Sequence, residues 1–259
     1  MSGLLIVNPR SGGGEPRAEQ LAAAATPLGV EVRELGEGED PGEIARASRA
    51  DVLGIAGGDG SLAAVAEVAL ERDVPFVCIP FGTRNHFARD VGLGRDDPLE
   101  ALHAFAGSER RIDVGRADDR LFLNNVSLGV YARLVHRREH HRRRRETFAR
   151  LRAWTAVLTH RRPLGITIDG EPVQSRIVLV ANNAYALDLP SLGARERLDE
   201  GKLHLYVPGD ERSGERFVVD AAAGRLEAAV DGEPDVLHTP IVFRIEPRAL
   251  RVLVPDGTA

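Results

Sequence analysis

The sequence predicts an α/β domain with a mostly parallel sheet, followed by an antiparallel, sandwich-like β domain. Through roughly the first hundred residues, short apolar runs alternate with segments of helical periodicity, which is the pattern of a parallel sheet covered by helices. Beyond about Arg110 the apolar runs become shorter and turn residues separate them, as in antiparallel strands. We therefore expect one domain over residues 1–109 and a second over residues 110–259, whose last strands either stay in it or return to the first domain.

In the first domain, each buried strand is expected as a short apolar run and each helix as an amphipathic or alanine-rich segment. The strands are predicted at Leu4–Val7, Val30–Leu35, Val52–Ala56 and Pro75–Ile79. The helices are predicted at Pro16–Leu28, Pro41–Ala47, Ser61–Leu70, Asn85–Val91 and Pro98–Ala106. In the second domain the strand-like runs are LFLNNVSLGV, GITIDGEPVQ, RIVLVANN, GKLHLYV and RLEAAVDGE, and a basic helix near residues 133–160 interrupts them.

Composition narrows the class of protein. The 259 residues are 43% hydrophobic and 28% charged, which is ordinary for a soluble protein with a buried core. Apolar runs stay well short of the ~18 residues of a membrane span, and the first residues lack the basic flank and long apolar stretch of a signal peptide. The single cysteine, Cys78, excludes an intramolecular disulfide and a cysteine zinc cluster. We expect a cytoplasmic protein in which Cys78 is a small core residue.

Positive charge is concentrated in one segment. Residues 133–162 hold eleven arginines against two glutamates, a local charge of +9, whereas the whole chain carries −5. Such a segment suggests an anionic surface as partner, phospholipid or nucleic acid, or else a solvated helix face. The 34 basic residues include one lysine, Lys202, so a nucleotide's phosphates would have to be held by backbone amides and arginine rather than by a P-loop lysine.

Three glycine-containing loops follow predicted strands of the first domain: NPRSGGG, GGDGS and PFGTRNH. In a parallel sheet all three lie at the carboxyl edge, where ligands usually bind. Glycines let the backbone approach a polyphosphate, the helix that starts near Ser61 directs its amides at it, and Asp59 can engage magnesium or the nucleotide. The alternative is a plain strand-to-helix turn with Ser61 as N-cap. We favour a nucleotide site made of Asn8, Ser11, Gly57, Gly58, Asp59, Gly60, Ser61, Gly82, Thr83, Asn85 and His86.

These loops, with the longer PFGTRNHFARDVGL and the later LDEGKLHLYV and VDGEP, resemble the diacylglycerol kinase catalytic-domain family, in particular the soluble bacterial lipid kinases related to YegS. The motifs follow the family's order through nearly the whole chain. The resemblance implies an enzyme that uses ATP and Mg²⁺ to phosphorylate a lipid hydroxyl, on a diacylglycerol-like or phosphatidylglycerol-like acceptor. Because GGDG also occurs in NAD kinases and phosphofructokinases, the alternatives are a soluble-metabolite kinase of the NAD kinase type and a member that binds nucleotide or lipid without catalysis.

Phosphoryl transfer also needs a base at the acceptor hydroxyl, and a carboxylate is the candidate. DGEP occurs twice, as residues 169–172 and 231–234. The first copy lies between two strand-like runs, where Asp-Gly is an expected hairpin turn and Glu171 an exposed residue. The order of the second copy matches the family's acidic site, so the resemblance assigns the general base to Glu233 and leaves Asp59 to serve the Mg-nucleotide. Without the resemblance, the second copy also fits a hairpin turn.

The chain departs from the family at two places. His86 stands where the family's GTxND loop has an aspartate, and Asp90 lies at helical spacing, able to hold the imidazole or to supply the missing charge. A structural magnesium site of the family is matched by Glu200, with backbone carbonyls from Arg197 and Lys202. The glutamate is longer than the aspartate that the resemblance leads one to expect, and two cations flank it.

The basic segment also carries an apolar stripe, formed by Phe148, Leu151, Trp154 and Leu158. A helix with such a stripe beside arginines can lie on an anionic bilayer, or it can pack on the β domain. The resemblance to lipid kinases favours peripheral attachment at the inner membrane surface, where a lipid substrate is embedded. Nucleic acid is not an expected partner, because no recognisable binding module surrounds the run. The sequence is compatible with a homodimer and does not decide the oligomeric state.

Overall fold

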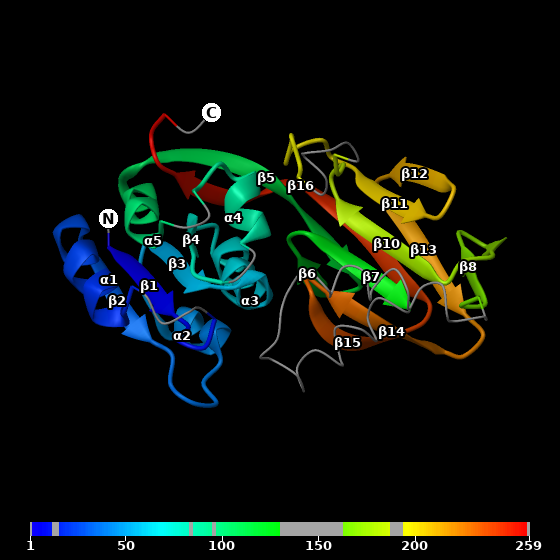
Figure 1. The fold of residues 1–259 in the computed structure, drawn as a ribbon, viewed down its shortest axis with the longest axis horizontal. Helices are drawn as coiled ribbons and strands as arrows, with labels where there is room; N and C mark the ends of the chain where they lie inside the picture. The colour runs from blue at the N-terminus through cyan, green and yellow to red at the C-terminus, as the bar shows by residue number, and fades with distance from the viewer. Residues whose placement is uncertain are drawn as a thin grey trace. The chain divides into compact units, whose positions relative to one another are not determined.

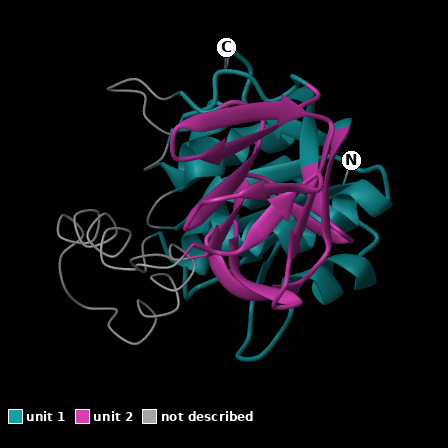
Figure 2. Ribbon diagram, turned by 90° about the vertical axis from the view of Figure 1, so that its right-hand side faces the viewer, with its two compact units in different colours: residues 1–114, 185–200, 247–259 teal, residues 115–184, 201–246 magenta. Residues whose placement is uncertain are grey.

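The computed structural model describes residues 2–11, 16–82, 85–94, 97–129, 163–186 and 194–257. It divides into two compact units, which Figure 2 distinguishes by colour. Unit 1 comprises residues 1–114, 185–200 and 247–259, and unit 2 comprises residues 115–184 and 201–246. The chain therefore leaves unit 1 and returns to it twice. The basic helix expected near residues 133–160, with its apolar stripe, lies outside the described residues.

Unit 1 contains the parallel sheet that the sequence predicts (Figure 1). Its strands β1 (Gly3–Val7), β2 (Val30–Glu34), β3 (Val52–Gly57) and β4 (Phe76–Pro80) lie in the order β2-β1-β3-β4. All three pairings are parallel, and the end of β16 (Ile241–Val254) adds a further parallel partner to β4. Strands β1, β3 and β4 are buried along their whole length, which explains why each reads as a continuous apolar run.

The helices of unit 1 agree with the predicted order, and all but α2, which has the predicted bounds, differ at their ends. They are α1 (Ala18–Ala25), α2 (Pro41–Ala47), α3 (Asp59–Glu71), α4 (His86–Asp90) and α5 (Pro98–Ala101). The helix expected at 16–28 ends early and continues as a 3₁₀ helix at Thr26–Leu28, because Pro27 lacks the N–H that an α-helix would use. The helix expected at 98–106 likewise divides into α5 and a 3₁₀ helix at Leu102–Ala106.

Helix α3 positions the second glycine loop. It packs on β3 and β4, and its buried face includes Leu62, Val65 and Val68. A single residue, Gly58, separates the end of β3 from the first residue of α3. The N-terminus of α3 therefore lies at the carboxyl edge of the parallel sheet.

Unit 2 is built from antiparallel strands, again as predicted. Its six-stranded sheet has the order β12-β11-β10-β7-β14-β15. These strands are β7 (Asn125–Gly129), β10 (Ile177–Asn182), β11 (Leu203–Val207), β12 (Asp210–Gly214), β14 (Arg225–Val230) and β15 (Glu233–His238). Strand β5 (Ser108–Ala117) belongs to unit 1 up to residue 114 and enters unit 2 with its last three residues. The remaining strands of unit 2 are β6 (Arg120–Phe122), β8 (Ile166–Ile168), β9 (Glu171–Val173) and β13 (Arg216–Ala221), of which β13 pairs with both β8 and the first residues of β16.

One apolar core joins the two sets of strands in unit 2. It includes Val126 and Val178 from the six-stranded sheet and Phe122, Phe217 and Phe243 from the other strands, all of them buried. Because each sheet turns one face to this core, the arrangement is the sandwich-like packing expected from the sequence. Within the described ranges, no helix is both long and apolar enough to cross a membrane.

Candidate functional site

The three predicted glycine loops meet at the carboxyl edge of the unit 1 sheet. A Cβ atom placed on Gly82 would lie 2.6 Å from the Cα of Gly58, and one placed on Gly58 would lie 3.9 Å from Oγ of Ser11. The loops after β1, β3 and β4 therefore touch through residues with small side chains. A larger residue at Gly82 would push the backbone of the second loop away, so the close approach explains this glycine.

The first loop is shaped by Asn8. The Asn8 amide donates to the carbonyl of Ala56 on β3 (2.9 Å), and its side-chain Oδ1 accepts from the amide of Arg10 (3.1 Å). The amide of Ser11 donates back to the carbonyl of Asn8 (3.1 Å). Asn8 thus folds the loop so that Ser11 reaches Gly58. Residues 12–15, the rest of this glycine run, lie outside the described residues.

The second loop differs from the plain turn in which Ser61 would be the N-cap. Gly58 occupies the N-cap position of α3, and both the amide and the Oγ of Ser61 donate to the Gly58 carbonyl (2.9 Å each). A Cβ on Gly57 would lie 2.1 Å from that Ser61 Oγ. The first turn of an α-helix carries amides without intrahelical acceptors, and here it opens beside Ser11 and Gly82.

Asp59 links the second loop to α4. Its Oδ2 accepts from the amide of His86 (3.3 Å) and its Oδ1 accepts from the amide of Phe87 (3.1 Å). The carboxylate therefore lies at the N-terminus of α4, where negative charge is favourable. Burial raises the pKa of the Cys78 thiol on β4 well above its usual value, and the charge of Asp59 adds to that rise. Cys78 accordingly stays a neutral core thiol beneath the loops.

The third loop closes on itself through Asn85. The Gly82 amide donates to Asn85 Oδ1 (2.8 Å), and Asn85 Nδ2 donates to the Gly82 carbonyl (2.9 Å). Asn85 is buried and has a left-handed backbone with φ of +47°, so it is the N-cap of α4 rather than its first residue. His86, half-buried, opens the helix. Thr83 lies outside the described residues.

Asp90 takes part in a buried ion-pair cluster that the sequence does not reveal. Its Oδ1 accepts from Nε of Arg89 (2.6 Å) and its Oδ2 from Nε of Arg195 (2.8 Å). The side chains of Asp90 and Arg195 are 1% and 0% exposed, and the Arg195 guanidinium lies 6.0 Å from the ring centroid of Tyr185. Since both pairs are formed within unit 1, Asp90 fastens the segment around residue 195 to α4.

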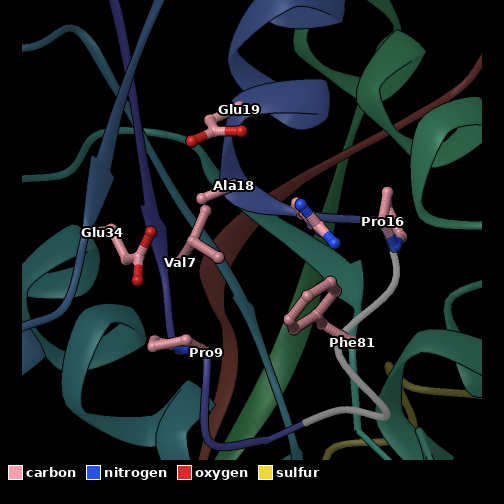
Figure 3. Close-up of a pocket in the computed structure, with 8 residues that line it drawn as sticks. Val7, Pro9, Pro16, Ala18, Glu19, Glu34 and Phe81 are labelled. Carbon is pink, nitrogen blue, oxygen red and sulfur yellow. The ribbon is translucent and has the colours of Figure 1, made fainter.

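A cavity of about 240 Å³ lies beside the first and third loops (Figure 3). Its lining residues come from four separate segments of unit 1: Val7, Pro9, Pro16, Arg17, Ala18, Glu19, Glu34 and Phe81. In Figure 3, Glu19 and Glu34 lie on one side and Phe81 and Pro16 on the other. An aromatic ring opposite carboxylates suits a planar ligand that carries hydrogen-bond donors. Sequence reasoning missed this cavity because no short motif unites its walls.

The predicted magnesium site combines one carboxylate, that of Glu200, with the backbone carbonyls of Arg197 and Lys202, and it stays a prediction. Asp199, beside Glu200, accepts hydrogen bonds from Arg197 (3.1 Å) and Arg248 (3.0 Å). Burial works to raise the pKa of Asp199, but these two arginines outweigh it and lower that pKa. The Lys202 carbonyl accepts from the amide of Asn183 (3.1 Å). Among the described residues, no group of three His, Cys, Asp or Glu side chains is placed to hold a metal ion.

Both DGEP copies form the same tight hairpin in unit 2. In the first, Asp169 and Gly170 connect β8 to β9, and in the second, Asp231 and Gly232 connect β14 to β15. All four residues have positive φ, between +48° and +87°. This is the two-residue turn that Asp-Gly favours. Glu233 is the first residue of β15 and is exposed, as Glu171 is in β9.

The two aspartates nevertheless have different surroundings. Asp231 is 7% exposed, and its carboxylate accepts from the amides of Leu123 (2.7 Å), Asn124 (2.7 Å) and Asn125 (3.0 Å). Asp169 is exposed and its Oδ1 accepts from the amide of Val218 (2.8 Å). The turn next to Glu233 is therefore tied into the interior of unit 2, whereas the turn next to Glu171 is not.

A layer of buried asparagines continues from Asp231. The side-chain amide of Asn182 donates to the carbonyl of Leu123 (3.0 Å), and Nδ2 of Asn183 donates to Oδ1 of Asn182 (3.2 Å). The backbone amide of Asn182 donates to the carbonyl of Asn124 (2.9 Å). Sequence reasoning missed these residues. Two Asn-Asn doublets, one where β7 begins and one where β10 ends, are the sequence signal that could have identified them.

Known proteins similar to this chain agree on one family. Residues 2–117 match the family model described as diacylglycerol kinase catalytic domain. A probable lipid kinase YegS-like protein of Pseudomonas aeruginosa is 34% identical over 139 residues, which span 51% of this chain and 45% of the relative. A diacylglycerol kinase of Mycobacterium tuberculosis is 29% identical over 196 residues, which span 71% of this chain and 61% of the relative.

The chain thus spans between about half and three fifths of the length of these two curated relatives. Among solved structures, a diacylglycerol kinase from Bacillus anthracis has the same fold, with a TM-score of 0.73. The two share 20% sequence identity, and the alignment covers 100% of this chain and 98% of the other.

Proposed function

We propose that the chain is a member of the diacylglycerol kinase catalytic-domain family, whose model matches residues 2–117, and that it is an ATP-dependent lipid kinase that phosphorylates a hydroxyl group of a membrane lipid. The observation that carries the proposal is the meeting of Ser11, Gly58 and Gly82 at the N-terminus of α3. Backbone that can approach this closely, beside the N-terminus of a helix, is what a polyphosphate requires. The absence of a P-loop lysine is consistent with phosphates held by amides.

The cavity next to these loops supports ATP as the phosphoryl donor, because it can hold the nucleoside while the loops hold the phosphates. Phe81 precedes Gly82 and Pro9 follows Asn8, so the cavity begins where the first and third loops begin. Phe81, which is mostly buried, forms part of an apolar wall of the cavity against which a purine can lie. The Glu19 and Glu34 carboxylates can accept hydrogen bonds from ribose hydroxyls or an exocyclic amine. In this arrangement the triphosphate extends from the cavity toward Gly58.

Glu233 is the proposed general base at the acceptor. Its carboxylate takes the proton of the lipid hydroxyl while the hydroxyl oxygen forms a bond to the γ-phosphorus. The bond between the γ-phosphorus and the oxygen that bridges to the β-phosphorus breaks, and ADP leaves with that oxygen. Mg²⁺ would screen the phosphates when bound with ATP. Asp59 is the residue that we assign to the Mg-nucleotide. Its carboxylate also accepts hydrogen bonds from the amides of His86 and Phe87 in α4.

Attachment to anionic membranes is a further part of the proposal. It is motivated by the local charge of +9 over residues 133–162, which lie outside the described residues. Liposome sedimentation tests it: binding should rise with phosphatidylglycerol content, fall with added salt, and weaken when Arg142–Arg145 are changed to glutamine. Equal binding to neutral vesicles, or no binding at all, would contradict electrostatic attachment.

The test of the enzymatic function is transfer of radiolabel from [γ-³²P]ATP to lipids in mixed micelles. The panel should include diacylglycerol, phosphatidylglycerol and sphingoid lipids, with NAD as the soluble acceptor. Label in one or more lipids is the expected result and identifies the acceptor. Label in NAD alone would favour a metabolite kinase, and ATP binding without transfer to any acceptor would indicate a binding protein without catalysis.

A further inference from the structure

Asp231 makes more hydrogen bonds than its hairpin turn requires. A carboxylate that is 7% exposed is costly unless hydrogen bonds compensate it, and here three backbone amides do so. The first DGEP copy provides the comparison. Asp169, in the same conformation, is exposed and accepts from one amide, that of Val218 on β13. Asp231 therefore makes two more such hydrogen bonds than its counterpart, and it makes them while buried.

These hydrogen bonds connect the β14–β15 turn to the start of β7, which pairs with β14 on the side away from β15. In the order β7-β14-β15, strand β15 is the last of the six-stranded sheet, so Glu233 is held through its pairing with Val230 on β14. Asp231 reaches across to residues 123–125, where β7 begins, and β7 in turn pairs with β14 at Val126 and Val230. The turn before Glu233 is thus fixed to two strands rather than one.

Residues 123–125, to which Asp231 is hydrogen bonded, are also held by β10. Asn182, at the end of β10 and 1% exposed, donates from its side chain to Leu123 and from its backbone to the carbonyl of Asn124. The segment that Asp231 grips is therefore fixed by β10 as well. A buried polar layer whose members bond to one another is rigid and specifies a single arrangement.

We propose that Asp231 is a positioning residue for Glu233, which holds the β14–β15 turn at a fixed place against residues 123–125. The inference rests on the proposed function, in which Glu233 is the base. Asp231 acts through geometry, because misplacement of a reacting group by about 1 Å can cost on the order of 100-fold in rate. Asp169 is its matched control, since it occupies the same turn at the surface, with one hydrogen bond to β13 in place of three buried ones.

A double-mutant cycle tests whether Asp231 acts through Glu233. In the wild-type background, Asp231→Asn should lower kcat by about 10- to 100-fold with the KM for ATP unchanged, and Asp169→Asn should leave kcat within about twofold. In the Glu233→Gln background, Asp231→Asn should change kcat by less than about twofold, because the residue that it positions is gone. An equal loss in both backgrounds would overturn the proposal. Full activity of Glu233→Gln alone would instead overturn the proposed base.

Hydrogen exchange supplies a readout that needs no activity. Peptides that contain residues 123–125 should exchange at least about 10-fold faster in Asp231→Asn than in the wild type, and at the wild-type rate in Asp169→Asn. Unchanged exchange in Asp231→Asn would show that the carboxylate does not hold the turn. This result would contradict the inference whichever acceptor the enzyme uses.

A second pair of variants covers the case in which Asp231→Asn does not fold. Gly232 and Gly170 have φ of +87° and +84°, and a Cβ atom on either would meet no atom within 4 Å. Alanine should therefore strain both turns equally without removing a buried acceptor. Gly232→Ala should lower kcat by about 10-fold or more, and Gly170→Ala should not. Equal activity of the two variants would overturn the proposal.

Discussion

The two DGEP turns of unit 2 have the same four-residue sequence and the same backbone conformation, yet their aspartate carboxylates have different environments. Asp169 and Glu171 lie at the surface, where Glu171 pairs with Arg212 at 3.2 Å. Asp231 is buried under three amides, and the turn that it anchors precedes Glu233. The tetrapeptide determines the turn, whereas residues more than a hundred positions away in the sequence determine that the aspartate of the second copy is buried. A short motif therefore predicts local structure far better than it predicts a site.

The largest expected difference between the turns is catalytic. Glu233→Gln removes the proposed base and should lower kcat by about 100- to 10,000-fold, whereas Glu171→Gln removes a surface carboxylate and should leave kcat within about twofold. Steady-state phosphorylation of the acceptor identified in the lipid panel measures both. If Glu171→Gln were the damaging change, the roles of the two copies would be reversed.

The second expected difference is in stability. Asp231→Asn keeps one acceptor oxygen but places an amino group against a buried amide, which should lower the free energy of unfolding by about 1–3 kcal/mol. Asp169→Asn keeps the oxygen that Val218 needs and should cost less than about 1 kcal/mol. Urea unfolding of both variants gives the comparison. Equal losses would mean that the buried bonds of Asp231 contribute no more than an exposed turn.

A glycine of the nucleotide loops extends the comparison to unit 1. Gly82→Ala places a Cβ atom 2.6 Å from the backbone of Gly58, whereas Gly170→Ala meets open space. Gly82→Ala should therefore raise the KM for ATP by about 10-fold, equivalent to ~1.4 kcal/mol, and Gly170→Ala should leave it unchanged. An unchanged KM for Gly82→Ala would show that nucleotide binding does not depend on the close packing of these loops.

The smallest effect is expected at the surface of the first turn. Arg212 pairs with Asp210 at 2.9 Å and with Glu171 at 3.2 Å, on solvent-accessible side chains. Because water and salt screen such pairs, Arg212→Gln should change neither the unfolding temperature nor kcat measurably. A clear loss of activity would show that the first DGEP copy has a role that its exposure does not suggest.

The comparison also shows how far sequence reasoning reaches in this chain. The α/β unit, the antiparallel unit and the glycine loops follow from patterns within a few residues, and the structure differs mainly at ends such as the one that Pro27 imposes on α1. The bonds from Asp59 to α4 and from Asp231 to residues 123–125 join positions 27 or more apart. No periodicity marks such pairs, because they depend on how the strands are ordered in space.

The Asp90–Arg195 pair illustrates the same limit for charged residues. The two side chains are 105 positions apart in sequence and both are buried. Helical spacing predicts His86, four residues away, as a partner of Asp90, because spacing along a helix is the relation that a sequence displays. Its two oxygens instead accept from Arg89 and Arg195.

The pH dependence of kcat tests the central claim, that Glu233 is the base of a lipid kinase, most directly. It should be measured for the wild type, Glu233→Gln and Glu171→Gln with the same lipid acceptor. A carboxylate accepts a proton when it is ionised, so kcat of the wild type should fall as the pH is lowered. The account predicts that this acid limb disappears in Glu233→Gln, leaving a low and flat rate, and persists in Glu171→Gln. An acid limb that is unchanged in Glu233→Gln would contradict the assignment.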